Sequence, residues 1–312
     1  MDIKNVVVAG GGVLGSQIAF QSAYKGFNVK VWLRSEGSIE RAKPKFERWK
    51  NVYLQTLEAM KTNPAAYARG LADSPELSDE QIEALKAQVE KAAESIVLTT
   101  SYDEAFGDAD LVIEAIAEEP KQKIELYTEM QKHLPEHTIV CTNSSTMLPS
   151  QFAEYTGRPE KYLALHFANE IWKNNTAEVM GHPGTDPAAY EQVAEFAGKI
   201  GMIPLRLKKE QPGYILNSML VPFLTAAESL LANGVADPET IDKTWMLATG
   251  APVGPFRILD IVGLVTAYNI VVMNPQASDP ETTPGKIAAT LKKYIDEGKT
   301  GVNAGEGFYK YK

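Results

Sequence analysis

Cysteine and histidine are scarce in this sequence. Its 312 residues include one cysteine, Cys141, and four histidines. A single cysteine excludes a disulfide within the chain, and such scarcity is typical of a reducing compartment, so we expect a cytoplasmic location. No group of cysteine, histidine and acidic residues has the spacing of a metal site, and we expect no bound metal.

Positive charge and long apolar runs are also lacking. The formal net charge is −9, with 31 Lys and Arg against 40 Asp and Glu, which disfavours nucleic acid or an anionic membrane as a partner. No apolar run is long enough to cross a bilayer, and we expect no signal peptide. With 44% hydrophobic and 23% charged residues, the chain has an ordinary globular composition, and its length favours about two domains.

What the sequence does contain is a regular alternation of short, valine-rich segments and helix-like segments. The strand-like segments are 3–9, 28–33, 96–99, 109–116, 138–143, 162–167, 176–180 and 202–207. Helix-like segments follow most of them, and two charged helices form an excursion between about residues 38 and 95. This order predicts an α/β fold: a Rossmann-type dinucleotide-binding domain over residues 1–207, with a mostly parallel sheet covered on both faces.

The last third of the chain has a different pattern. From Tyr214 onward it is almost entirely helical, with candidate helices over 214–232, 238–248, 255–273 and 284–296. We therefore predict an all-helical C-terminal domain over residues 208–312. In the charged excursion, by contrast, Lys and Glu alternate, which we interpret as solvated helix faces.

The segment VVVAGGGVLGSQIAF (residues 6–20) joins the first strand to the first helix through a glycine-rich turn. Gly10, Gly12 and Gly15 have the spacing of a dinucleotide-binding fingerprint, with Val13 and Leu14 between the last two. The first glycine permits the tight turn, the second lets the backbone approach a pyrophosphate, and the third lets helix and strand pack closely. The helix N-terminus then faces the phosphates. This context predicts a nicotinamide dinucleotide as cofactor.

The end of the second strand lacks an expected acid. The residue that would bind the adenosine ribose in NAD falls at Leu33, and Arg34 and Ser35 follow it. An arginine there can pair with a 2′-phosphate and a serine can donate to one, which favours NADP over NAD. The alternative is that Arg34 is a solvated residue and that Glu36 binds the ribose.

Two polar clusters follow later strands, CTNSSTMLPS (141–150) and LALHFANEIWKNNTAEVM (163–180). The second places His166 at a strand end and Glu178 in the next strand. Neighbouring strands would bring the two side chains together as a general base and a carboxylate that orients it. The other histidines, His133, His137 and His182, lie in polar or turn contexts, and we assign them no catalytic role.

These residues carry a resemblance. The glycine motif, DADLVIEAIAE, TNSST, HFAN, AEVM, GYILNSMLVPFL, GAPVGPF and EGFYKY stand in the order and near the spacing of the L-3-hydroxyacyl-CoA dehydrogenase family. The similarity covers nearly the whole chain. Within the family, which includes 3-hydroxybutyryl-CoA dehydrogenases, it is similar above all to the diketoreductase-like branch.

The resemblance implies roles for particular residues. His166 matches the catalytic histidine, Glu178 its carboxylate partner, and Ser145 and Asn217 the residues that bind the substrate oxygen. Cofactor-lining places fall at Glu118, Lys123, Asn143 and Asn169. The resemblance also implies a homodimer built by the helical domain, a short acyl-CoA as substrate and a part in fatty acid metabolism.

Two departures from the family pattern leave the substrate and cofactor open. Leu33 replaces the usual ribose-binding aspartate, and EIWKNNT (170–176) replaces a proline-containing stretch. The substrate alternatives are a free β-keto acid, a β-keto ester, a diketone or a sugar acid such as gulonate, and Trp172 is either a packing residue or a substrate contact. A non-catalytic nucleotide-binding protein is the rival class, and the complete set of predicted catalytic residues argues against it.

Overall fold

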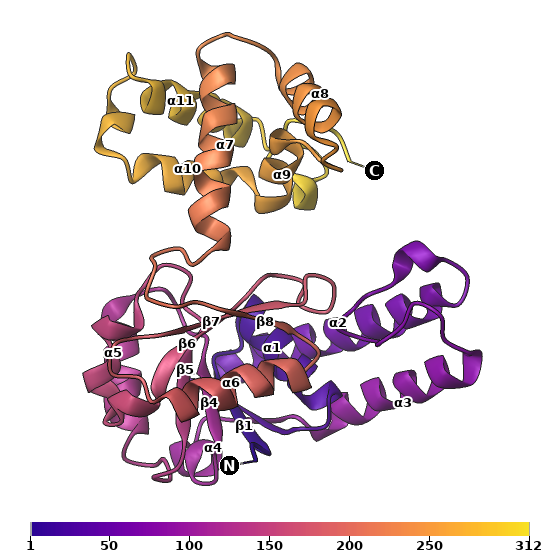
Figure 1. Ribbon diagram of the computed structural model, residues 1–312, viewed down its shortest axis with the longest axis vertical. Helices are drawn as coiled ribbons and strands as arrows, with labels where there is room; N and C mark the ends of the chain where they lie inside the picture. The colour runs from indigo at the N-terminus through magenta and orange to yellow at the C-terminus, as the bar shows by residue number, and fades with distance from the viewer. Residues whose placement is uncertain (1, 312) are drawn as a thin grey trace. The chain divides into compact units, whose positions relative to one another are not determined.

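A computed structural model describes residues 2–311 and divides the chain into two compact units, Met1–Ile215 and Leu216–Lys312 (Figure 1). The sequence prediction placed the change of character near residue 208. The last strand of the first unit ends close to that position, and the intervening residues still belong to the first unit.

The first unit is built on an eight-stranded sheet with the order β3-β2-β1-β4-β5-β6-β7-β8. The strands are β1 (Asn5–Ala9), β2 (Asn28–Trp32), β3 (Val97–Thr99), β4 (Leu111–Glu114), β5 (Ile139–Thr142), β6 (Tyr162–Phe167), β7 (Thr176–Gly181) and β8 (Ile203–Arg206). All neighbouring strands are parallel except β6 and β7. The predicted α/β class and mostly parallel sheet are confirmed.

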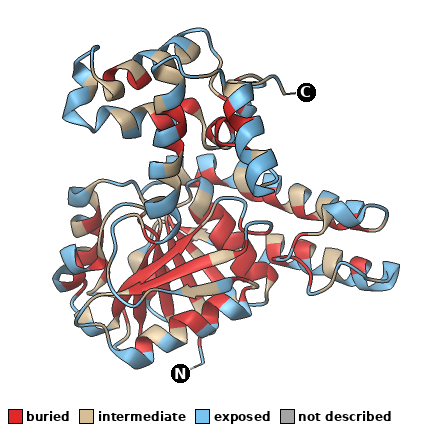
Figure 2. Ribbon diagram, turned by 45° about the horizontal axis from the view of Figure 1, so that its top comes forward, coloured by how far each residue is buried: buried red, intermediate tan, exposed pale blue. Residues whose placement is uncertain are grey.

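Helices cover both faces of this sheet. Along β1, Val6 and Val8 belong to one hydrophobic core, and Val7 and Ala9 belong to another. The flanking helices are α1 (Val13–Tyr24), α4 (Tyr102–Phe106), α5 (Pro120–Met130) and α6 (Pro187–Lys199). The central strands are buried along their length (Figure 2), which explains their nearly continuous apolar sequences.

The charged excursion forms a helical hairpin of α2 (Glu36–Met60) and α3 (Asp79–Ser95), which projects from the sheet domain (Figure 1). Ser78 begins α3 through a capping box with Gln81, which satisfies backbone donors that a helix start leaves free. On the outside, Lys61 pairs with Glu83 at 2.8 Å. The alternating charges therefore form a solvated face, as predicted.

The second unit consists of helices α7 (Leu216–Ala232), α8 (Pro238–Thr249), α9 (Pro255–Val262), α10 (Leu264–Val272) and α11 (Thr283–Asp296). The prediction of one continuous helix over 255–273 is wrong. Gly263, with φ of 93°, separates α9 from α10, and the two helices meet at 95°. In the residues described, no single helix is long and apolar enough to span a membrane, although this bent pair passes that test when taken together.

Short 3₁₀ turns complete both units. They are η1 (Pro64–Ala66), η2 (Pro149–Gln151), η3 (Ala153–Thr156), η4 (Pro159–Lys161), η5 (Pro275–Ser278) and η6 (Val302–Ala304).

In the second unit two buried carboxylates accept hydrogen bonds from distant backbone amides. Asp242 accepts from the amide of Phe256 at the start of α9, and Asp260 accepts from the amides of Phe308 and Tyr309 near the C-terminus.

Candidate active site

The glycine turn between β1 and α1 shows which glycines the protein itself requires. Gly10 has φ of 121°, and a Cβ on it would lie 2.5 Å from the carbonyl oxygen of Ala115. A Cβ on Gly15 would collide with the carbonyl of Gly10. Gly12 is different, because within the part of the chain that the structure describes, nothing around it lies within 4 Å of its Cβ position. Packing therefore explains two glycines, and the open space at the third fits the approach of a ligand to the backbone.

A cavity of about 750 Å³ opens at this turn, at the carboxyl ends of the strands. Among the predicted cofactor residues, its lining includes Gly10, Gly12, Val13, Leu14, Gly15, Arg34, Glu118, Lys123 and Asn143. Its size and position suit a dinucleotide. Ser35 and Asn169 are not among the lining residues. Ser35 caps α2 by accepting from the amide of Ser38, and the Asn169 carbonyl accepts from Asn174, so their cofactor contacts stay predictions.

The end of β2 presents cations to the cavity. Arg34 lines it, and so do Ser38, Arg41 and Lys45 of α2, which sequence reasoning did not select as cofactor residues. Lys45 donates from Nζ to the carbonyl of Gly11 at 2.7 Å. The spacing of 38, 41 and 45 on one helix face is the signal that could have found them.

The acid nearest to the end of β2, Glu36, does not line this end of the cavity. Glu36 accepts from the Thr100 hydroxyl at 3.3 Å and is not among the lining residues. Leu33 is buried, and a Cβ on Gly11 would meet its side chain. The place of the ribose-binding acid is thus filled by an apolar packing residue.

A buried ion pair supports the floor of the site. Glu114, at the end of β4, accepts from Lys123 Nζ at 2.7 Å and from the Tyr127 hydroxyl at 2.7 Å. It also accepts from the Thr142 hydroxyl and the Ile116 amide. Sequence reasoning missed Glu114, although an acid at the end of a buried strand was the available signal. Its several donors and its cation satisfy the charge inside the protein.

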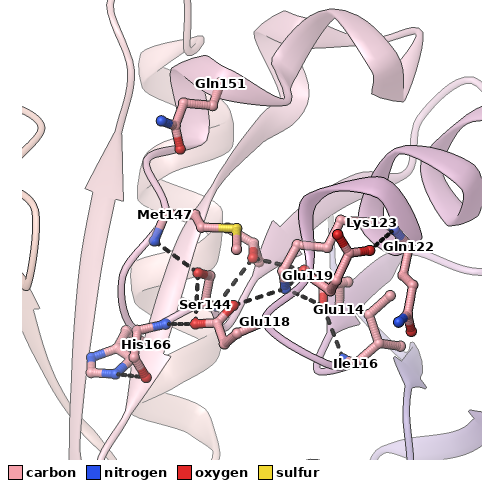
Figure 3. Close-up of polar contacts among 12 residues, drawn as sticks. Glu114, Ile116, Glu118, Glu119, Gln122, Lys123, Ser144, Met147, Gln151 and His166 are labelled. Carbon is pink, nitrogen blue, oxygen red and sulfur yellow. Dashed lines mark hydrogen bonds and ion pairs between the residues drawn. The ribbon is translucent and has the colours of Figure 1, made fainter. Parts of the chain in front are cut away.

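Glu118 connects this ion pair to the serine loop after β5 (Figure 3). Its carboxylate lies 3.3 Å from Lys123 Nζ. It accepts from the Ser144 hydroxyl at 2.8 Å and from the Ser145 amide at 2.5 Å. Glu118 therefore fixes the backbone that carries Ser145, besides lining the cavity.

The predicted acid–base pair comes together across the one antiparallel strand pair among those described. His166 of β6 is the register partner of Glu178 of β7. The imidazole Nδ1 lies 3.0 Å from the Glu178 Oε2, and both side chains are buried. The prediction that neighbouring strands place them side by side is confirmed. An ionised carboxylate only accepts, so the Nδ1 of His166 carries the hydrogen and Nε2 is left for chemistry.

Ser145 faces the other imidazole nitrogen. Its hydroxyl lies 3.1 Å from His166 Nε2, and Ser145 also lines the dinucleotide cavity. The remaining predicted catalytic residue, Asn217, lies on α7 in the second unit, and its contact with the substrate stays a prediction.

Trp172 is a packing residue, which decides the alternative left open by the sequence. It is buried, and its ring packs against Trp49 at 5.4 Å and Tyr53 at 5.6 Å, both on α2. Gly70 also packs closely against its backbone. The unusual segment after β6 thus anchors to the base of the helical hairpin.

The dinucleotide cavity and the adjoining serine–histidine–carboxylate chain define a class, the nicotinamide-dependent oxidoreductases. Two family models match this chain: the 3-hydroxyacyl-CoA dehydrogenase NAD binding domain over residues 5–211 and the 3-hydroxyacyl-CoA dehydrogenase C-terminal domain over residues 213–311. The chain belongs to the 3-hydroxyacyl-CoA dehydrogenase family. The predicted family and enzyme class are confirmed.

Individual relatives are similar to this protein over nearly its whole length. The mitochondrial hydroxyacyl-coenzyme A dehydrogenase of Homo sapiens is 33% identical over 99% of this chain and 92% of that protein. A probable 3-hydroxybutyryl-CoA dehydrogenase of Bacillus subtilis is 29% identical over 100% and 98%. A solved diketoreductase, described for dual catalysis of dicarbonyl compounds, is 48% identical with a TM-score of 0.85, and each chain is covered completely.

Proposed function

We propose that the protein transfers a hydride between a nicotinamide cofactor and the 3-hydroxy or 3-keto position of a short acyl-CoA. The observation that carries this proposal is the double contact of Ser145, which lines the dinucleotide cavity and hydrogen-bonds His166. A substrate oxygen bound beside Ser145 would be within reach of both the acid–base group and the cofactor cavity.

Each residue then has a definite task. The bound cofactor supplies or accepts the hydride. His166 Nε2 takes the hydroxyl proton during oxidation and returns it during reduction. Glu178 holds the Nδ1 hydrogen and stabilises the imidazolium, and Ser145, with Asn217 as the predicted second donor, positions the substrate oxygen and stabilises its developing charge.

NADP is the cofactor that we propose over NAD. Two guanidinium side chains, Arg34 and Arg41, line the cavity beside the end of β2, and Leu33 stands where a ribose-binding acid would lie. Guanidinium groups bind phosphate through paired hydrogen bonds. A higher affinity for NADH than for NADPH would contradict this part of the proposal.

A dicarbonyl compound is the second candidate substrate. The similarity to the diketoreductase, at 48% identity over the full length, favours it specifically. Free β-keto acids, β-keto esters and sugar acids use the same acid–base chemistry and stay as further alternatives. The substrate, and not the reaction, differs among these candidates.

One assay panel tests these proposals. Reduced-cofactor absorbance is followed with acetoacetyl-CoA, a β-keto ester, a diketone and free acetoacetate, and with gulonate plus oxidised cofactor, each with both forms of the nucleotide. We expect the highest kcat/KM with acetoacetyl-CoA and NADPH. A diketone preference would move the assignment to the second candidate, and no turnover with any compound would contradict the enzymatic proposal.

A homodimer in the cytoplasm completes the proposal. Exposed apolar side chains on α9 and at the end of α10, including Ile261 of α9 and Met273 directly after α10, at 64% and 79% exposed, support a second copy of the chain as partner. Light scattering on the purified protein tests the dimer, with Ile261→Glu expected to give monomers.

The buried, unbridged Cys141 fits a reducing compartment, which cell fractionation would test.

A further inference from the structure

Tyr214 lies against the catalytic histidine in a backbone conformation that tyrosine rarely adopts. Its φ is 55°, in the left-handed region where glycine and asparagine are far less strained. The residue is buried, and its ring stacks on the His166 imidazole with centroids 4.3 Å apart and planes 13° apart. A strained residue persists where its surroundings hold it in place, and such residues gather at functional sites.

The hydroxyl of Tyr214 makes a second connection. It donates to the carbonyl of Ser144 at 2.6 Å, and Ser144 directly precedes Ser145. Burial raises the pKa of the Tyr214 hydroxyl, so this group stays protonated and continues to donate. One side chain thus joins the face of the imidazole to the loop whose serine contacts Nε2.

The next residue, Ile215, contacts Glu178, the carboxylate partner of His166. The amide of Ile215 donates to Glu178 Oε1 at 2.8 Å, while the other carboxylate oxygen faces His166 Nδ1. Two hydrogen bonds at the ring nitrogens hold the imidazole by its edge. A flat ring against its face adds a further restraint, because tilting would weaken the stacking contact.

We propose that Tyr214 is a positioning residue for the proton transfer: its ring restrains the plane of His166, and its hydroxyl adds a weaker restraint on the loop of Ser145, which Glu118 also holds. The inference rests on the proposed acid–base function and deepens it. Proton transfer depends steeply on geometry, so a tilted imidazole slows the chemical step without changing nucleotide affinity.

Three variants separate the ring from the backbone conformation. Tyr214→Phe keeps the stacking and loses the hydroxyl. Tyr214→Asn keeps a residue that tolerates the left-handed conformation and loses the ring. Tyr214→Leu keeps apolar volume without a flat surface. We expect kcat to fall by roughly 30- to 100-fold in the Asn and Leu variants and by no more than about threefold in the Phe variant, with KM and cofactor Kd within about twofold of wild type.

A readout that does not need turnover distinguishes this inference from the proposed function. The Nδ1 proton of His166, assigned by its loss in His166→Gln, is followed by nuclear magnetic resonance. We expect it to persist in the wild type and in Tyr214→Phe and to broaden in the Asn and Leu variants. Wild-type inactivity with every substrate would contradict the proposed function and leave this measurement to decide the role of Tyr214.

Two results would overturn the proposed role of Tyr214. Asn and Leu variants with the kcat and the Nδ1 signal of the Phe variant would overturn the proposal. Thermal melts accompany the kinetics, and loss of the fold in both variants would make Tyr214 a structural residue and overturn it as well.

Discussion

One buried glutamate in each unit shows two different environments for a buried carboxyl group. In the sheet unit the buried Glu114 has Lys123 as a cation and several hydrogen-bond donors. In the helical unit Glu228 on α7 is 5% exposed, its Oε1 has no hydrogen-bond partner among residues 2–311, and burial raises its pKa to about 7. A buried carboxylate with a cation and several donors is compensated, whereas an unpaired one is held at a cost in stability.

The surfaces of the two units differ as well. Most of the large apolar side chains that are exposed belong to the helical unit, although it is the shorter of the two. They include Met219, Val235, Leu247, Ile261 and Met273. The sheet unit buries its apolar residues on both faces of the sheet, and several of its buried polar residues lie at the site. The helical unit is therefore the part of the chain for which a partner surface is expected.

The largest effect should follow from removing the paired cation of the sheet unit. Lys123→Met leaves the buried Glu114 carboxylate uncompensated, and we expect a loss of about 3–5 kcal/mol in the free energy of unfolding. Urea denaturation measures it, with the exposed Lys121→Met as control. The double variant Glu114→Gln with Lys123→Met should recover much of the loss, and a double variant no better than Lys123→Met would contradict the pairing argument.

Removing the catalytic histidine should affect the reaction rate more than the stability of the fold. His166→Gln removes the acid–base group, so we expect kcat to fall roughly 100-fold or more, with the Kd for the nucleotide little changed. Steady-state kinetics and fluorescence titration measure the two quantities, and His137→Gln on the surface is the control. Near-normal turnover by the variant would end the proposed mechanism.

The stability contributed by Glu228 in the helical unit should change with pH in the opposite direction from that of a carboxylate whose pKa is lowered by a cation. Because the folded-state pKa of Glu228 is raised from 4.5 to about 7, its protonated form stabilises the fold below about pH 4.5. That contribution is lost as the pH rises from 4.5 to 7. Glu228→Gln should therefore be more stable than wild type above pH 7, by about 2–3 kcal/mol.

Thermal melts of the wild type and of Glu228→Gln between pH 5 and pH 8 test this reasoning. The gap in Tm should widen as the pH rises. Glu239→Gln, an exposed change on α8, should show no such trend. A gap that stays constant with pH would mean that Glu228 is paired in solution.

The smallest effects concern the cations that line the cavity. Lys45 contacts the glycine turn, so Lys45→Met should weaken NADH and NADPH alike, by roughly tenfold, the scale of one charge-assisted contact. Arg34→Ala should weaken NADPH by a similar factor and leave NADH unchanged. Equilibrium titration with both nucleotides measures this, and Lys50→Met, whose ammonium pairs with Glu90, is the control. Equal losses for both nucleotides in Arg34→Ala would place the arginine away from the 2′-phosphate.

Much of the architecture was predictable, because it is encoded locally. Short apolar segments, many of them rich in valine, and serine caps specify strands and helix starts within a few residues of where the structure has them. Gly263 is the instructive failure: an apolar pattern continues across it, and only its positive φ turns α9 away from α10. Apolar periodicity reports burial and does not report a bend that one residue permits.

Local sequence patterns were enough to predict the class of fold, the glycine turn, the missing ribose-binding acid at Leu33 and the candidacy of His166 and Glu178. Each of these depends on residue type and on short spacing along the chain. The family resemblance then followed from the order of the same motifs.

The folded chain alone shows which distant residues meet. The contact of Ser145 with His166, the reach of Lys45 to Gly11 and the stacking of Tyr214 join segments far apart in the chain. Their geometry depends on the register of β6 against β7 and on a left-handed turn just before the second unit. Neither is encoded in a local pattern, because register and turn conformation are chosen by the packing of the whole unit.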